Sequence, residues 1–143
     1  MGKTNHVTTK WMGKMAFEST NPSGRIVRID TAEDDGGENS GYRPKALMLS
    51  SMAGCTGLDV ASLMKKMKLD VDDFTIEVVG ELSDAHPQTY EKVTMEYHFY
   101  GDNLNEKKLQ KAIDLSFEKY CGVSEMFKKF ADVKIASFFH HTS

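Results

Sequence analysis

Hydrophobic and polar residues alternate in two neighbouring segments, and this pattern predicts a β-hairpin. Residues 74–82 (FTIEVVGEL) and 92–101 (KVTMEYHFYG) both repeat with a period of two, and the polar stretch SDAHPQTY joins them. One face of the second segment carries Val93, Met95, Tyr97 and Phe99. The opposite face carries Thr94, Glu96 and His98. Such alternation is typical of antiparallel strands with one face on the core and one in solvent.

The rest of the chain predicts a single α+β domain over residues 1–143. Pro44 suits the first turn of a long helix, and Asn103 with Glu106 forms a plausible capping pair for a second helix. The other expected elements are strands at 6–12, 14–19, 25–30 and 133–139 and a short helix at 125–131 that Ser124 could cap. Residues 31–43 are polar and glycine-rich, so we expect a mobile surface loop there.

The first long helix is unusually poor in charge. From Ala46 to Met64 its only charged residue is Asp59. A helix that is apolar or small nearly all round is enclosed by other elements. One small sheet cannot cover it, so we expect a partner subunit, most simply a second copy of the chain. Ser, Thr, Gly and Asp59 interrupt the run, which argues against a membrane span.

The composition of the chain indicates which binding partners and which cellular compartment to expect. The chain has 143 residues, a net charge of −3 and a pI of about 5.9, which favour neither nucleic acid nor an anionic membrane as partner. The segment MGKTNHVTTKW carries no apolar signal region. Two cysteines do not form the disulfide framework of a small secreted domain. We therefore expect a cytoplasmic protein with reduced thiols.

The two cysteines, Cys55 and Cys121, are the main candidates for chemistry. Buried cysteine is often a small inert core residue, and small neighbours let helices approach closely. Alternatively, Gly54 and Gly57 clear space above the Cys55 sulfur for a substrate, since each helical glycine costs about 0.8–1.0 kcal/mol relative to alanine. Cys121 lies between two predicted helices, where a thiol can have a lowered pKa or can simply pack. The two are 66 positions apart, so any pairing depends on the fold.

Other common site motifs are absent from the sequence. The histidines form no H-E-x-x-H or finger-like spacing, and no phosphate-binding or G-x-S-x-G pattern occurs. His140 and His141 are expected in solvent. The sequence predicts neither a metal nor a cofactor.

Two segments together resemble a known family. The stretches RPKALMLSSMAGCTGLDVASLMKK and LNEKKLQKAIDLSFEKYCGVSEMFKK are similar to the OsmC/Ohr family of osmotically inducible and organic-hydroperoxide-resistance proteins, and best to its OsmC-like branch, which has a similar EKYC segment. The resemblance implies an intertwined homodimer with antiparallel sheets wrapped around long central helices.

The same resemblance implies a thiol peroxidase. Cys55 matches the peroxidatic cysteine and Cys121 the resolving cysteine. The substrate would be an organic hydroperoxide, and a dithiol or redoxin-type protein would restore the thiols without metal or cofactor.

One family feature is missing. The peroxidases pair an arginine from the N-terminal strands with a glutamate nine or ten residues before the reactive cysteine, and those positions here are Lys45 and Ala46. Lys45, Arg43 and Lys14 are then the candidate cations for stabilising a thiolate. The alternative is a non-peroxidase member that binds a small apolar ligand at the dimer interface, with redox-sensing or structural cysteines.

Overall fold

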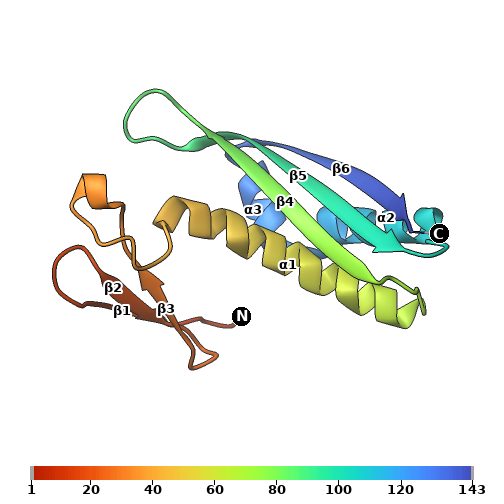
Figure 1. Ribbon diagram of the computed structural model, residues 1–143, viewed down its shortest axis with the longest axis horizontal. Helices are drawn as coiled ribbons and strands as arrows, with labels where there is room; N and C mark the ends of the chain where they lie inside the picture. Colours follow the sequence, from red (N-terminus) through yellow and green to blue (C-terminus); the bar gives the residue numbers. More distant parts are fainter. Residues whose placement is uncertain (1, 143) are drawn as a thin grey trace. The chain divides into compact units, whose positions relative to one another are not determined.

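The computed structural model describes residues 2–142 and has the predicted α+β order of elements (Figure 1). The elements are β1 (Thr8–Trp11), β2 (Phe17–Thr20), β3 (Ile26–Ile29), the 3-10 helix η1 (Glu33–Asp35), α1 (Pro44–Lys66), β4 (Asp73–Leu82), β5 (Tyr90–Gly101), α2 (Glu106–Leu115), the π-helix η2 (Ser116–Tyr120), α3 (Gly122–Lys128) and β6 (Asp132–His141). The chain divides into two compact units, residues 1–48 and 49–143.

Unit 1 contains a small antiparallel sheet, sheet A, in the order β1-β2-β3. Its strands are only four residues long, and none of their residues is buried. Trp11 and Ile26 are each 61% exposed. A three-stranded sheet without a covered face has little apolar burial to stabilise it.

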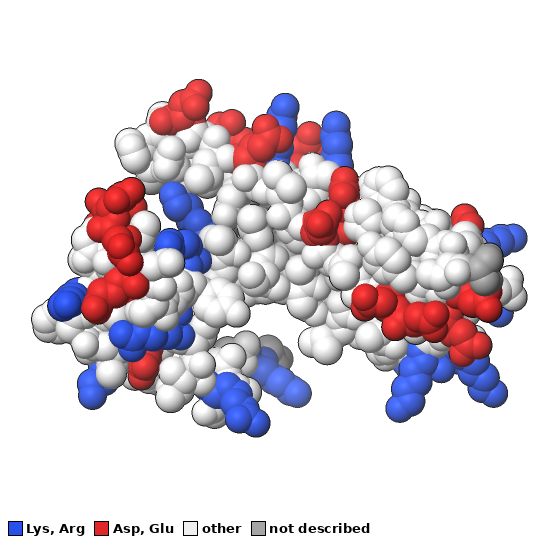
Figure 2. Space-filling view, in the orientation of Figure 1, with Lys and Arg blue, Asp and Glu red and all other residues white. Residues whose placement is uncertain are grey.

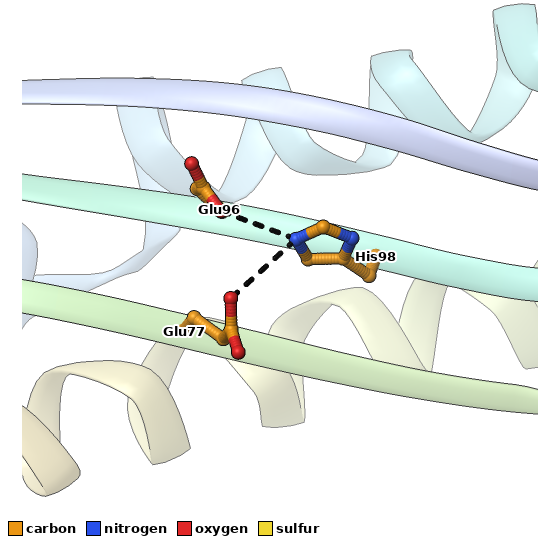
Figure 3. Close-up of side chains that lie close together, drawn as sticks. All are labelled: Glu77, Glu96 and His98. Atoms are coloured by element: carbon orange, nitrogen blue, oxygen red, sulfur yellow. Dashed lines mark hydrogen bonds and ion pairs between the residues drawn. The ribbon is translucent and has the colours of Figure 1, made fainter.

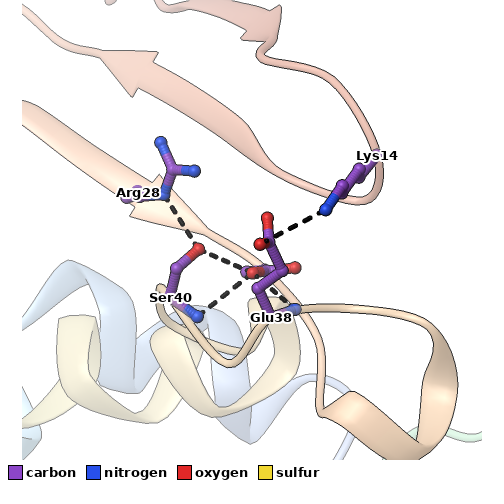
Figure 4. A network of polar contacts seen from close by, with 5 residues as sticks. Lys14, Arg28, Glu38 and Ser40 are labelled. Atoms are coloured by element: carbon purple, nitrogen blue, oxygen red, sulfur yellow. Dashed lines mark hydrogen bonds and ion pairs between the residues drawn. The ribbon is translucent and has the colours of Figure 1, made fainter.

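The buried carboxylate of Asp30 organises the loop that follows sheet A. Asp30 is 3% exposed and accepts hydrogen bonds from the Thr31 and Glu38 amides at 2.7 and 3.1 Å. It also accepts from the Ser40 hydroxyl at 2.6 Å and the Ser40 amide at 3.1 Å. Arg28 donates to the same hydroxyl at 2.9 Å (Figure 4). These bonds, that from the Ser40 hydroxyl foremost, hold the pKa of Asp30 well below its usual range despite burial.

The segment 31–43 is a loop, as its composition predicts, but it contains η1 and many fixed contacts. Tyr42 bridges to Ile29, and its amide donates to the Arg28 carbonyl at 2.8 Å. A β-carbon at Gly41 would collide with that same carbonyl oxygen, so the chain needs glycine there.

Unit 2 contains sheet B, in the order β4-β5-β6. The predicted hairpin of β4 and β5 is antiparallel, whereas β6 lies parallel to β5, with Val93 opposite Val133. Sheet B is therefore mixed, which corrects the expectation of purely antiparallel sheets. A parallel neighbour needs a long crossover, and α2, η2 and α3 supply it.

One face of sheet B forms the core with α1, α2 and α3. The fully buried apolar side chains are Met52, Val60, Val93, Met95, Tyr97, Phe99, Leu109, Ala112 and Ile113. They come from the predicted apolar face of β5 and from one stripe of each long helix. The assignment of faces made from the alternating pattern is thus confirmed for β5.

Only one stripe of α1 is buried within a single chain. Its buried residues are Met52, Thr56 and Val60, spaced four apart, while Leu58 is 76% exposed. Figure 2 shows an uncharged area in the middle of the view, along α1. The expectation of a helix enclosed on all sides is therefore not met by the elements of one chain.

By length and composition alone, helix α1 could cross a membrane. The sequence analysis argued against a membrane span because Ser, Thr, Gly and Asp59 interrupt the apolar run. Core helices of soluble proteins pass the same test, so this property carries no assignment by itself.

Two helix caps differ from the sequence expectations. The Asn105 side chain, rather than Asn103, caps α2 and accepts from the Lys108 amide at 3.1 Å. Cys121, rather than Ser124, is the N-cap of α3. The observed cap lies two residues after the predicted one for α2 and three residues before it for α3, because element boundaries are the least certain feature read from sequence.

We predict that Asp30→Asn loosens the loop after sheet A, because an amide cannot accept all four hydrogen bonds. Hydrogen exchange at the Glu38 and Ser40 amides should become clearly faster than in wild type. Asp34→Asn, on the exposed side of η1, is the matched control and should leave both amides protected. Equal protection in the two variants would contradict the role of Asp30.

The lowered pKa of Asp30 predicts that its contribution to folding stability depends on pH. Its pKa is lower in the folded than in the unfolded chain, so the stability it contributes is present above a pH of about 4 and declines as the pH falls further. The difference in urea midpoint between wild type and Asp30→Asn should therefore shrink on acidification. A difference that stays constant from pH 7 to pH 3 would contradict this assignment.

Candidate functional site

The fold brings the two cysteines of unit 2 together. Cys55 lies on α1 and is half-buried, and Cys121 lies at the junction of η2 and α3 and is buried. Both are free thiols. Their side chains are close enough to interact, because the neighbouring Cys55 thiol is among the causes that raise the pKa of Cys121. Two residues 66 positions apart in sequence thus share one site.

Burial and hydrogen bonding act in opposite directions on Cys121. Burial is the largest effect and raises the pKa of its thiol, since the charged form loses water. The Ser124 hydroxyl and amide lie 3.0 and 3.4 Å from the sulfur and lower the pKa by donating to it. The net shift is upward, which favours the neutral thiol.

The π-helix η2 sets the position of Cys121. The Cys121 amide donates to the Ser116 carbonyl at 2.7 Å, a five-residue step, before the backbone becomes extended at φ −79° and ψ 100°. Lys128 secures this junction: its Nζ donates to the Phe117 carbonyl at 2.7 Å and lies 3.9 Å from the Phe117 ring centroid. Wide helical turns of this type occur often at functional sites.

Buried hydroxyl groups connect the elements that carry the cysteines. Thr56 Oγ1 on α1 lies 2.8 Å from Tyr97 Oη on β5 and 2.8 Å from Ser116 Oγ on η2. Ser116 donates to Asp59 Oδ2 at 2.9 Å. Burial raises the pKa of Tyr97 to about 12, and the charges of Cys121 and Asp59 act in the same direction. This hydroxyl network therefore lies in the same neighbourhood as the thiols.

Two surface cavities open beside this site. The first has a volume of about 380 Å³ and is lined by Asp59, Ser62, Leu63, Lys66 and Tyr120. The second has a volume of about 220 Å³ and is lined by Phe117, Glu118, Lys119, Tyr120, Cys121, Gly122 and Glu125. The second gives a route from solvent towards Cys121, and both contain a lysine that the sequence analysis did not single out.

Two of the three predicted cations, Lys14 and Arg43, make their described contacts within unit 1. Lys14 pairs with Glu38 at 3.5 Å (Figure 4). Arg43 donates to the Asn39 side chain at 2.7 Å and to the Gly41 carbonyl at 3.1 Å. Lys45 is exposed, ten residues before Cys55 on α1, which corresponds to about 15 Å along a helix axis. Their role in stabilising a thiolate stays a prediction.

The glycines around Cys55 differ in their surroundings. A β-carbon at Gly54 would meet no atom within 4 Å, whereas one at Gly57 would lie 3.4 Å from Ile76 Cδ1 on β4. Gly57 therefore allows α1 to pack closely on sheet B, as the packing interpretation expects. Gly54 is exposed and has open space around its own Cα, so helix packing does not require glycine there.

Sequence reasoning missed the residues around the thiols, although some left a signal. Asp59 is the only charge in the apolar part of α1, and Thr56 is a polar residue within the stripe of Met52 and Val60. Ser116 continues the apolar stripe of α2 by one helical turn. A polar residue in an apolar stripe predicts a buried hydrogen bond, but its partner cannot be identified from one segment.

The fold and the thiol pair define a class before any relative is considered. It is an α+β protein in which a long, largely uncharged helix presents one cysteine next to another at a helix junction. Residues 37–136 match the model of the OsmC-like protein family. The chain belongs to this family, as the two cysteine segments predict.

Individual relatives agree with this assignment. Protein YhfA of Escherichia coli strain K12 is 27% identical over 124 residues, covering 87% of this chain and 90% of YhfA. The crystal structure of a hypothetical protein from Aquifex aeolicus VF5 is 30% identical, with a TM-score of 0.85 over 99% of this chain and 100% of the other. The organic hydroperoxide resistance protein OhrB of Bacillus subtilis shares the fold, at 22% identity and a TM-score of 0.66 over 95% and 98% of the two chains.

We predict that Thr56→Val destabilises the protein by about 1–3 kcal/mol, because the buried Tyr97 and Ser116 hydroxyls each lose a partner. Equilibrium urea unfolding measures the change. The exposed Thr75→Val, the same chemical change on β4, is the control and should stay within about 0.5 kcal/mol of wild type. Equal stabilities of the two variants would show that the hydroxyl network contributes nothing.

Proposed function

We propose that the protein is a thiol-dependent peroxidase that reduces organic hydroperoxides through Cys55 and Cys121. The observation that carries the proposal is the proximity of these two thiols, one half-buried on α1 and one buried at the η2–α3 junction. Membership of the OsmC-like family and the shared fold of organic hydroperoxide resistance proteins support it. We place the reaction in the cytoplasm, with a dithiol or redoxin-type reductant and neither nucleic acid nor membrane as partner.

The proposed reaction needs no group beyond the two thiols. The Cys55 thiolate attacks the terminal oxygen of the hydroperoxide and the O–O bond breaks. The alkoxide leaving group takes up the proton that Cys55 released on ionisation and departs as the alcohol. The resulting sulfenic acid at Cys55 then condenses with the Cys121 thiol, which forms a disulfide and releases water. The two electrons that the peroxide takes up come from the two sulfurs, and the reductant returns them.

The exposure and the protonation of the two thiols support Cys55 as the attacking cysteine and Cys121 as the resolving cysteine. Cys55 is the more accessible of the two. Cys121 is 3% exposed, and its raised pKa makes it a poor first nucleophile, because the thiolate is the attacking species. A buried neutral thiol next to Cys55 suits the resolving role.

One observation favours a second function. Position 46 is alanine and position 45 is lysine, so this turn of α1 offers no carboxylate to hold an arginine over the reactive sulfur. In the second function the protein binds a small apolar ligand at a dimer interface, and the cysteines serve as redox sensors or core residues. The two functions differ in turnover: only the peroxidase consumes hydroperoxide repeatedly when a dithiol is present.

The proposed roles of the two cysteines predict different behaviour for the Cys55→Ser and Cys121→Ser variants. With cumene hydroperoxide and excess dithiol, wild type should turn over, and Cys55→Ser should lose at least about 100-fold in rate, because serine is a far weaker nucleophile at its ordinary pKa. Cys121→Ser should still be oxidised once at Cys55 but form no intramolecular disulfide. Trapping of the sulfenic acid followed by intact mass spectrometry distinguishes these species.

Three results would contradict the proposal. Wild type could show no turnover with cumene hydroperoxide while binding it or its alcohol, which would support the ligand-binding function. Cys121→Ser could lose the first oxidation as completely as Cys55→Ser, which would reverse or remove the assigned roles. Hydrogen peroxide could react as fast as the organic substrate, which would contradict the substrate class.

We further propose that the working form is a homodimer in which a second copy covers α1. Met48 and Leu58 on α1 are exposed apolar residues, and sheet A buries none of its strand residues. Large exposed apolar patches on soluble proteins commonly mark interaction surfaces. A second copy is the simplest occupant, because one two-fold operation covers the same surface on both chains.

We predict that wild type sediments as a dimer of about twice the 16.0 kDa chain mass at micromolar concentration. Leu58→Lys should shift it towards monomer, because a charge would be buried at the interface. Val79→Lys is the matched control: it is also an exposed apolar residue, but it lies on the solvent face of β4. A wild-type monomer, or equal dissociation in both variants, would contradict the proposed interface.

A further inference from the structure

We propose that the solvent face of sheet B carries a site for a divalent transition-metal ion, formed by Glu77, Glu96 and His98. Glu77 on β4 is the direct cross-strand partner of Glu96 on β5, and His98 follows two residues later on the same face. Figure 3 shows both carboxylates directed at the His98 ring. The proposal is independent of the thiol chemistry, since no residue is shared with it.

The spacing of the three ligand atoms fits a small cation. His98 Nε2 lies 3.3 Å from Glu96 Oε1 and 3.7 Å from Glu77 Oε2. All three ligand atoms lie within 4.8 Å of one another. Zinc bonds to nitrogen and oxygen are about 2.0–2.2 Å long, so neighbouring ligand atoms of a tetrahedral ion lie roughly 3.3–3.6 Å apart. Small side-chain rotations would bring the more distant Glu77 to this spacing.

Charge also favours a cation between the two glutamates. Like charges directly opposite each other on neighbouring strands are destabilising. Among residues 2–142, the ion pairs found for Glu77 and Glu96 are all with His98, which can supply at most one positive charge. A divalent ion would neutralise both carboxylates while leaving the imidazole neutral.

The ring of His98 is already held in an orientation that suits a ligand. It stacks on Phe138 of β6 with a centroid distance of 4.7 Å, and its Nδ1 lies 3.0 Å from His140 Nε2. When Nδ1–H donates to His140, the lone pair of Nε2 points at the two carboxylates. His140 is in turn stacked on Tyr100 at 4.5 Å. Metal-binding histidines commonly use such an outer hydrogen bond to fix the tautomer and the ring.

The ligand set selects the class of ion. One imidazole and two carboxylates with an open fourth position match zinc, whereas calcium and magnesium prefer sites made of oxygen alone. The Glu77 side chain is 69% exposed, so the site is open to solvent and to exchange of the ion. His140 is a positioning residue here, because it acts through His98.

The test measures Zn²⁺ binding to the reduced full-length protein by competition with a chromophoric chelator. Wild type should bind one equivalent at this site. His98→Gln should weaken binding at least about 100-fold, and Glu77→Gln and Glu96→Gln about 10-fold or more. His140→Phe keeps the stacking but removes the outer hydrogen bond, and should cost about 10-fold. Glu81→Gln, on the same face of β4, is the matched control and should bind as wild type.

The cysteine pair is a competing zinc site, so every titration is repeated in the Cys55→Ser/Cys121→Ser variant. The proposed site should keep its equivalent of Zn²⁺ there, and Co²⁺ in its place should show no thiolate charge-transfer band. Zinc lost with the cysteines, or unaffected by both His98→Gln and the exposed Glu77→Gln, would overturn the proposal. So would the absence of any bound ion in the cysteine-free variant.

Discussion

The hydroxyl of Thr56 is the contact on which the arrangement of the site depends. It lies between Tyr97 on β5 and Ser116 on η2, so it ties the central helix to both the sheet and the helical crossover. Thr56 directly follows Cys55, and Ser116 lies five residues before Cys121. A buried hydroxyl needs a hydrogen-bond partner, and a rotation of α1 that moved Thr56 away would leave the Tyr97 and Ser116 hydroxyls with one partner fewer each. This requirement fixes the rotation of α1 that presents Cys55 to the second thiol.

The same helix leaves apolar side chains exposed in the single chain. One stripe of α1, formed by Met52, Thr56 and Val60, is buried in the chain. Other apolar residues of α1, such as Leu58, stay exposed. Sheet A has the same deficit, since no residue of its strands is buried. Apolar burial is the main favourable contribution to folding, so a surface that covered either region would stabilise it. The proposed homodimer would supply such a surface.

The two faces of sheet B carry the residues of the two proposed sites. The inner face carries Tyr97 and supports the thiols, while the outer face carries Glu77, Glu96 and His98. Alternation along β5 places Tyr97 and His98 next to each other in sequence but on opposite sides of the sheet. One strand can therefore position residues of the proposed redox site and of the proposed cation site, which share no side chain.

The sequence by itself determined the order of elements, the inward face of β5 and the two cysteines as candidates. These features follow from local periodicity, from the spacing of apolar residues and from segments that resemble a known family. Only the tertiary structure decided that β6 runs parallel to β5, that Cys121 caps α3, and that Glu77 lies opposite Glu96. Strand register and side-chain partners depend on residues far apart in the chain, and no local pattern encodes the partner of a polar group. The apolar stripe around Thr56 can therefore indicate that this hydroxyl needs a partner, but only the folded chain selects Tyr97 and Ser116. The contact between His98 and His140 has no signal in the local sequence.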